Sequence, residues 1–171
     1  MAVDDADSYQ QWIMGVLNRL SPALESQIRT ILSYRFHPRV VLLDVEVFPD
    51  GLREGLPMRM FLIDAQNCET FHDDPAYFLP SSIGFLEEIT EVIPTDEADR
   101  RSRYEAAGID TVEIEMVALI DWFIACWMRA GGQQSTLPAY ICRHDERESF
   151  DLRRMKWEAN ARGKWTHFLQ K

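Results

Sequence analysis

The 171-residue sequence lacks the short motifs that mark several common enzyme classes. It contains no glycine-rich phosphate loop, no GxSxG, no HExxH and no CxxC. Its two adjacent glycines, Gly131 and Gly132, follow a predicted helix, whereas a phosphate-binding loop precedes one. These absences argue against a nucleotide-dependent enzyme, a GxSxG serine hydrolase and a zinc protease of the common kinds.

Cysteine is scarce, and the chain has no long apolar run. The three cysteines, Cys68, Cys126 and Cys142, predict free, mostly buried thiols in a reducing, cytoplasmic setting. The most apolar run, residues 117–128, contains Asp121 and is far shorter than the roughly 20 residues that span a bilayer. The acidic start, MAVDDADSYQ, has neither the basic nor the apolar part of a secretory signal. We therefore expect neither secretion nor membrane association.

What is present is the composition of an ordinary globular domain. Apolar residues make up 46% of the chain and charged residues 27%, and five Trp and nine Phe supply large side chains for a core. The length suits one domain with a substantial interior. We predict a single domain over residues 1–171, in which residues 155–171 could form an irregular basic tail.

The N-terminal region has the apolar periodicity of helices. Apolar residues recur at spacings of three and four from Trp12 to Leu32. Ser21 and Pro22 interrupt this pattern with the pair typical of a helix start, a capping serine followed by proline in the first turn. Two N-terminal helices are therefore expected.

Three further helices are expected in the middle of the chain. Residues 83–93 are compatible with a short helix, and residues 95–107, polar nearly all round, predict a solvated one. Residues 111–130 have the strongest pattern, behind a capping box formed by Asp110 and Glu113. They predict one long buried central helix.

Strands are predicted in two parts of the chain, where apolar and polar residues alternate. Residues 39–48 and 57–65 would pair as an antiparallel hairpin, with residues 67–71 as a short third strand. Residues 137–144 and 149–158 would form a second hairpin. Helices combined with an antiparallel sheet of about four to five strands in hairpins predict an α+β fold.

Charge is unevenly distributed along the chain. Residues 44–121 carry 19 acidic and five basic side chains, whereas residues 122–171 carry five acidic and nine basic ones. An acidic middle repels nucleic acid and anionic membrane, and it favours a basic partner through long-range steering. The plain alternative is that these acids only keep the protein in solution. The acids of residues 113–115 are expected to be surface charges of the central helix.

Carboxylates on the predicted strands are candidate binding residues. Asp44 and Glu46 share the polar face of one strand, and Asp64 lies on its neighbour. In a cleft, such a set could carry out acid–base chemistry or hold magnesium, whereas on an open sheet it would only be solvated. The predicted acidic partner-binding face consists of Asp44, Glu46, Asp64, Glu69, Asp73 and Asp74.

Two His-Asp clusters suggest a different kind of site. His144 and Asp145 follow Cys142 at the end of a predicted strand, and a second cluster begins at His72 and ends at Asp74. If the two segments meet, His72, Asp74, His144 and Asp145 would hold the metal of a hydrolase. Zinc requires three or four protein ligands, and nothing in the spacing predicts that these converge. The simpler interpretation is a buried Cys142, with His144 at the strand margin before a charged turn.

Two tryptophans are candidate interface residues. Trp122 lies off the apolar stripe of the central helix, and Trp157 lies among basic residues near the C-terminal end. Trp and Arg often anchor protein interfaces. Basic residues among aromatics could also stack on single-stranded nucleic acid, a use that the acidic body disfavours. The basic segment could instead fold back on the acidic middle.

The function expected from these features is that of a non-catalytic, cytoplasmic binding protein of the inhibitor, adaptor or immunity type, directed at a basic protein partner. No cofactor, nucleic acid or membrane is expected to bind. The alternative is a metal-dependent hydrolase that uses the His72–Asp74 and His144–Asp145 clusters. Self-association into a homo-oligomer through strand edges is a third possibility.

Overall fold

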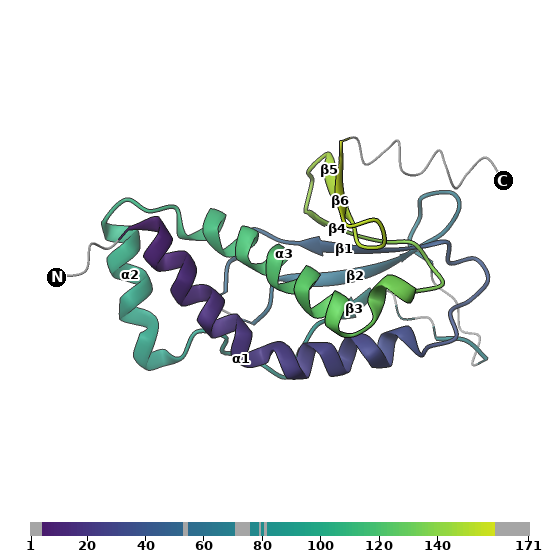
Figure 1. Ribbon diagram of the computed structural model, residues 1–171, viewed down its shortest axis with the longest axis horizontal. Coiled ribbons are helices and arrows are strands. Elements are labelled where there is room, and N and C mark those ends of the chain that lie inside the picture. Colours follow the sequence, from purple (N-terminus) through teal and green to yellow (C-terminus); the bar gives the residue numbers. More distant parts are fainter. Residues whose placement is uncertain (1–4, 53–54, 71–75, 79, 81, 160–171) are drawn as a thin grey trace.

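The computed structural model has an α+β fold built on one mixed sheet (Figure 1). It describes residues 5–52, 55–70, 76–78, 80 and 82–159. The helices are α1 (Ala6–Leu32), α2 (Ala98–Ala106) and α3 (Thr111–Arg129), with short 3-10 turns at Thr95–Glu97 and Gly132–Gln134. The strands are β1 (Leu42–Val47), β2 (Met58–Ile63), β3 (Ser82–Gly84), β4 (Ala139–Arg143), β5 (Glu148–Asp151) and β6 (Lys156–Ala159), in the sheet order β3-β2-β1-β4-β5-β6.

The core lies between the central strands and the pair α1 and α3, which run side by side along one face of the sheet (Figure 1). Leu43, Val45 and Val47 of β1 point into it and are fully buried, together with Leu17 of α1 and Phe123 of α3. These three residues of β1 alternate with polar ones, as the two-residue period of a strand requires. No helix within the described ranges covers the opposite face of the sheet.

α1 is one helix, where the sequence predicted two. Pro22 lies inside it, exposed to solvent, and the helix bends partway along its length (Figure 1). A proline in a helix interior costs roughly 3 kcal/mol, because it removes a backbone hydrogen bond and crowds the preceding turn. The apolar stripe nevertheless continues from Ile13 and Leu17 to Ile28, all fully buried, and their burial offsets that cost. The predicted interruption at Ser21 and Pro22 is therefore wrong.

Residues 83–93, predicted as a helix, instead begin with the edge strand β3. The side-chain amide of Gln27 on α1 holds this segment in place. Its Nε2 donates to the Gly84 carbonyl at 2.9 Å, and its Oε1 accepts from the Leu86 backbone N–H at 3.0 Å. Ile83 and Leu86 are both buried. The apolar residues of this segment have a helix-like spacing in the sequence, but their side chains enter the core from a short strand and the turns that follow it.

The two other helices in this part of the chain are confirmed. At the start of α3 the Asp110 carboxylate accepts from the Glu113 backbone N–H at 3.1 Å, and Gly131, with φ 85°, follows its end. α2 is present but is not wholly solvated, since Arg101 and Tyr104 are buried. Among the described residues, no helix is long and apolar enough to cross a bilayer.

The sheet is mixed and has six strands, whereas an antiparallel sheet of four to five was predicted. The antiparallel β1–β2 hairpin is confirmed. β1 and β4 instead pair in parallel, with Glu46 opposite Cys142. A parallel pair needs a long crossover, and α2 and α3 lie in the connection that supplies it. The third strand expected at residues 67–71 is absent from its described part, where Glu69 makes only an isolated bridge with Ile63.

The strand predicted over residues 149–158 is in fact two strands. The Asp151 carboxylate accepts two backbone N–H groups from the following turn, each at 2.8 Å, and so reverses the chain between β5 and β6. Met155 completes this turn with a φ of 55°. The expected irregular tail therefore begins as the edge strand β6, and residues 160–171 lie outside the described residues.

Candidate functional site

The helix-free face of the sheet forms a groove of about 1110 Å³. The sheet curls, so that β5 and β6 rise beside β1 and β4 (Figure 1). Asp44, Glu46, Cys142 and Ser149 contribute to the groove from these strands, and residues 143–148 line it from the end of β4, the turn and the start of β5. This groove is the candidate functional site.

The alternation along β1 determines which residues face the groove. Asp44 and Glu46 lie on this side, and Leu42 forms a small buried apolar cluster there with Ile63 of β2 and Tyr140 of β4. Burial, with smaller effects from neighbouring charges, raises the pKa of Tyr140 to about 12. Its hydroxyl therefore stays protonated at neutral pH. The polar residues of the groove thus adjoin an apolar patch on the same face of the sheet.

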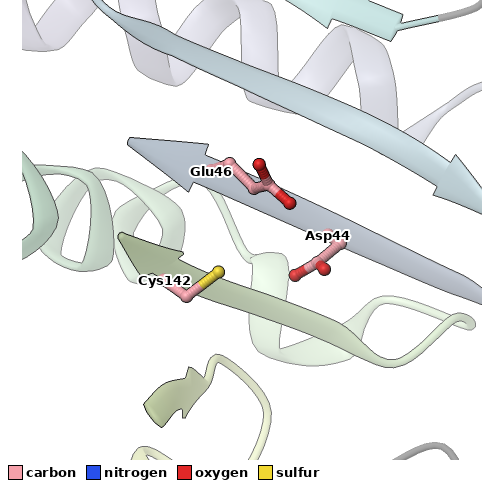
Figure 2. A group of neighbouring side chains, drawn as sticks. All are labelled: Asp44, Glu46 and Cys142. Atoms are coloured by element: carbon pink, nitrogen blue, oxygen red, sulfur yellow. The ribbon is translucent and has the colours of Figure 1, made fainter. Parts of the chain in front are cut away.

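Asp44, Glu46 and Cys142 bring three potential metal-ligand atoms together. One carboxylate oxygen from each acid and the Cys142 Sγ lie within 4.8 Å of one another. Figure 2 shows the three side chains on the same side of two neighbouring strands. Asp44 is 8% exposed and Cys142 6%, while Glu46 is half-buried. The parallel register, which sets Glu46 opposite Cys142, creates this arrangement.

His144 lies beside this cluster, directly after β4. Its Nδ1 is 2.7 Å from a carboxylate oxygen of Glu46, and its ring centroid is 4.6 Å from that of Phe48. The hydrogen bond with Glu46 is the main cause of a raised His144 pKa. The other ring nitrogen, Nε2, is 3.5 Å from the carboxylate of Asp145, which is largely exposed. His144 thus fixes the orientation of the Glu46 carboxylate.

The groove is lined mainly by acidic side chains. Arg143, one of its cations, is bound by Glu113 of α3 through two hydrogen bonds of 2.6 and 2.9 Å. Glu113 itself lies outside the groove, so Arg143 shares its charge between Glu113 and the lining residue Glu146, whose carboxylate oxygen lies 3.6 Å from a guanidinium nitrogen of Arg143. The lining carboxylates are Asp44, Glu46, Glu69, Asp145, Glu146 and Glu148, and the lining cationic residues are Arg143 and Arg147, with His144 beside them.

The structure brings part of the predicted acidic face together. Asp44, Glu46 and Glu69 all line the groove. Asp64 does not, because its Oδ1 accepts two backbone N–H groups of its own turn, each at 2.9 Å. The remaining two members of the predicted face, Asp73 and Asp74, lie outside the described residues.

Glu146 and Glu148 reach the groove, although no sequence pattern grouped them with β1. They follow β4 in the chain, and only the parallel pairing of β4 with β1 carries them to this face. Hydrophobic alternation identifies which side of a strand is buried, but it does not identify the neighbouring strand. The sequence shows that these side chains are acidic, but it does not show which residues lie next to them in the fold.

The structure shows the positions of only two of the four residues of the predicted hydrolase metal site. His144 and Asp145 lie at the groove, whereas His72 and Asp74 lie outside the described residues. Their convergence therefore stays a prediction. The simpler interpretation matches the positions of the late residues, since Cys142 is buried in β4 and the half-exposed side chain of His144 begins the charged turn.

The two candidate interface tryptophans differ in exposure. Trp122 is fully buried, and its Nε1 donates to the Ser21 hydroxyl at 2.8 Å. It is a core residue and not a surface aromatic, because α1 packs along that side of α3. Trp157 is 51% exposed on β6, and its ring packs edge-on against Phe150 at 5.5 Å. A second, smaller hollow of about 300 Å³ is lined by Arg143, Glu146, Glu148 and Trp157.

A buried polar cluster among the helices was missed from the sequence. Glu115, expected at the surface of the central helix, is fully buried. It accepts hydrogen bonds from the Tyr9 hydroxyl, from the Leu52 backbone N–H at 2.9 Å and from Arg101 Nε at 2.7 Å. Desolvation alone would lower the pKa of Arg101, but the bond with Glu115 outweighs it and the pKa is raised. Because these donors satisfy the carboxylate, the cluster joins structural elements and offers no free group for chemistry.

Comparison of the chain with models of known protein families, with curated protein sequences and with solved structures found no match. A function therefore has to be inferred from the groove itself. Its acidic lining, its exposed turn and the tryptophan beside that turn are the features that such an inference can use.

Proposed function

We propose that this protein is a non-catalytic, cytoplasmic binding protein of the inhibitor, adaptor or immunity type, and that its groove receives a basic segment of a protein partner. The observation that carries this proposal is the charge of the groove, where six carboxylates face two arginines. Lysine or arginine side chains entering the groove would form charge-assisted hydrogen bonds with these carboxylates. Such bonds are stronger in a partly desolvated hollow than on an open surface.

Trp157 supports the proposal as an anchor beside the acidic turn. It is one of two large apolar residues that are exposed among the described residues, and it shares its hollow with Glu146 and Glu148. Tryptophan is enriched among the residues that dominate binding energy. An arginine of the partner could pack its guanidinium on the indole while it bonds to a neighbouring carboxylate.

The charge of the whole chain favours the same kind of partner. Its formal net charge is −10, which would attract a basic protein before contact and speed its association. The alternative of a metal-dependent hydrolase depends on residues 72–74, which lie outside the described residues. No observation in the described part of the chain favours that hydrolase over a binding role.

The proposal can be tested by capturing the partner from an extract of the native cells on the immobilised full chain. A groove variant removes three exposed acids that line the groove: Glu69→Gln, Glu146→Gln and Glu148→Gln. A control variant removes three exposed acids that do not line it: Asp7→Asn, Glu88→Gln and Asp99→Asn. Both variants have the same net charge, so a difference between them reports on the groove and not on overall charge.

A basic protein that the wild type and the control variant retain at low salt, and the groove variant does not, supports the proposal. It should leave the column as ionic strength rises from about 0.1 M to about 1 M, because the screening length falls from about 10 Å to about 3 Å. Equal retention by the groove variant, or binding that does not weaken with salt, contradicts the proposal. An empty column at low salt counts against it as well.

A further inference from the structure

We propose that Asp44, Glu46 and Cys142 form a site for a divalent transition metal, zinc or a close substitute, on the strands that line the groove. This inference does not depend on the proposed binding of a partner. The sequence suggested Asp44 and Glu46 as possible magnesium ligands, but it did not place Cys142 beside them. Two carboxylate oxygens and a thiolate sulfur combine hard and soft donors. Zinc accepts this mixture in four-coordinate sites, whereas magnesium and calcium prefer oxygen ligands alone.

The donor atoms already lie near the separations that zinc requires. Bonds of about 2.3 Å to sulfur and about 2.0–2.2 Å to oxygen place the ligands of a tetrahedral ion about 3.5 Å from one another. The three donor atoms lie within 4.8 Å of one another, so small side-chain rotations close the remaining distance. All three project from β1 and β4, which are paired in a fixed register (Figure 2). A site on paired strands is held more rigidly than one on loops.

Ser149 provides a second, independent indication of a ligand. It is fully buried on β5, it lines the groove, and its hydroxyl has no hydrogen-bond partner among the residues that the structure describes. Continuing the pairing of Ile141 with Phe150 by one step sets Ser149 beside Cys142. A buried hydroxyl without a partner is unfavourable, because it has given up its hydrogen bonds to water. Water bound to the metal as its fourth ligand would supply the missing hydrogen bond.

His144 acts as a positioning residue in this site. Its Nδ1 bonds one carboxylate oxygen of Glu46 at 2.7 Å, which leaves the other oxygen for the metal. Carboxylates that bind metals are commonly held by such outer hydrogen bonds, and their loss typically weakens affinity about 10–100-fold. The imidazole thereby contributes to the site without being a ligand.

Metal binding would also change the charge of the site. Asp44 is buried, and one of its carboxylate oxygens lies within 4.8 Å of a carboxylate oxygen of Glu46. When the metal binds, the S–H bond of Cys142 breaks, the proton passes to solvent, and the sulfur donates an electron pair to the ion. The divalent ion then offsets the charge of the two carboxylates and the thiolate.

The first experiment uses the wild-type full chain and zinc alone. X-ray absorption at the zinc edge should report one sulfur at about 2.3 Å and oxygen or nitrogen ligands at about 2.0 Å. Native mass spectrometry should show one zinc ion per chain. A zinc shell without sulfur, or with more than one sulfur, overturns the proposal, as does the absence of stoichiometric binding. Because no substitution is involved, these outcomes do not depend on whether a variant folds.

The second experiment uses cobalt as a spectroscopic probe. Wild-type protein should show the near-ultraviolet charge-transfer band of a thiolate bound to cobalt. Cys142→Ser should lose this band, whereas Cys68→Ser, a change at an exposed thiol outside the groove, should keep it. Circular dichroism establishes that each variant is folded. A band that survives in Cys142→Ser, or disappears in Cys68→Ser, contradicts the assignment.

The acidic ligands are tested by zinc affinity with a matched control. Asp44→Asn and Glu46→Gln should each weaken zinc binding by more than about 10-fold, since each removes a ligand charge. Glu148→Gln removes the same charge at an exposed position of the same groove and should leave the affinity nearly unchanged. His144→Ala should lower the affinity about 10–100-fold while the cobalt–thiolate band remains. An equal loss for Glu148→Gln would indicate only general attraction of cations to the groove, and would overturn the proposed site.

Discussion

The hydroxyl of Tyr9, near the start of α1, donates a hydrogen bond to the carboxylate of Glu115 on α3, 106 residues further along the chain. Both residues are fully buried. Arg101 of α2 and the Leu52 backbone N–H donate to the same carboxylate. A buried carboxylate is tolerated only when hydrogen bonds and a counter-charge replace water. The cluster therefore joins all three helices and the loop after β1 at one point.

We expect Tyr9→Phe to lower the free energy of unfolding by about 1.5–3 kcal/mol, because it leaves the charged Glu115 short of one donor. Urea unfolding of the two proteins measures this difference. Tyr34→Phe is the control, since this half-buried tyrosine stacks its ring on Phe78 at 3.8 Å and would keep that contact. Its expected effect is within about 0.5 kcal/mol. Equal losses in the two variants would show that the bond to Glu115 contributes nothing specific.

We expect the free energy of unfolding to fall at alkaline pH because of Tyr9. Burial, followed by the bond with Glu115, raises the pKa of Tyr9. The unfolded chain releases this proton near pH 10, whereas the folded chain retains it to higher pH. The contribution of Tyr9 is therefore complete below about pH 10 and declines above it, by up to about 1.4 kcal/mol per pH unit.

Unfolding at several pH values should then show the stability gap between wild type and Tyr9→Phe narrowing above about pH 10. Other groups also titrate in this range, but they do so in both proteins, and the difference isolates Tyr9. A gap that stays constant to the alkaline limit would contradict the expected effect of Tyr9.

We expect the substitution Gly51→Ala to destabilise the same cluster around Glu115. The φ of Gly51 is 71°, and a Cβ added there would lie 2.8 Å from a carboxylate oxygen of Glu115 and 3.3 Å from a guanidinium nitrogen of Arg101. Gly108 has a similar φ of 79°, but an added Cβ would meet nothing within 4 Å. Alanine at Gly108 should therefore cost only the left-handed backbone penalty of about 1–2 kcal/mol.

Gly51→Ala should cost this penalty and, in addition, about 1–3 kcal/mol for displacing hydrogen-bonded groups around Glu115. Comparing the denaturant midpoints and slopes of Gly51→Ala and Gly108→Ala measures the difference. Similar losses for the two variants would mean that the cluster adjusts freely, which would be inconsistent with its role as a fixed junction.

The start of α3 and the β1–β2 hairpin, which depend on residues close together in the chain, were predicted correctly. The start of α3 follows from Asp110 and Glu113, and its length follows from a continuous apolar period ended by Gly131. The β1–β2 hairpin follows from alternation on both strands. In each of these cases the stabilising contacts lie within a few residues or within one hairpin, so the local sequence contains them.

Features that depend on distant contacts were not predicted. Pro22 predicted the start of a second helix, but the apolar residues before and after it are buried in the core, and this burial keeps α1 continuous. Ile83 and Leu86 have helical spacing, but Gln27, from another element, holds their segment in place. The helix propensity of a segment predicts its structure only weakly, and tertiary contacts can override it. In both cases the contacts that decide the structure involve α1.

The candidate site was visible in the sequence only as separate parts. Asp44 and Glu46 were identified as neighbours on one strand face, and Cys142 and His144 as close residues at the end of another strand. Their meeting depends on β1 and β4 pairing in parallel, with Glu46 opposite Cys142. The sequence interpretation placed the late strands in their own hairpin. No local pattern specifies such a non-sequential pairing, which is decided by how the crossover helices pack on the sheet.

The three cysteines lead to a prediction about thiol reactivity that also bears on the site. Cys68 is exposed, whereas Cys126 and Cys142 are buried, and burial is the main cause of a raised pKa for the Cys126 thiol. Because only an accessible thiolate reacts quickly, a thiol reagent should modify one cysteine rapidly in the native protein and all three in denaturant. Cys68→Ser should remove the rapid phase, and a rapid phase that persists in this variant would mean that Cys126 or Cys142 is accessible. Zinc distinguishes the two, because it should protect Cys142, which is 6% exposed, and leave the reactivity of Cys126 unchanged.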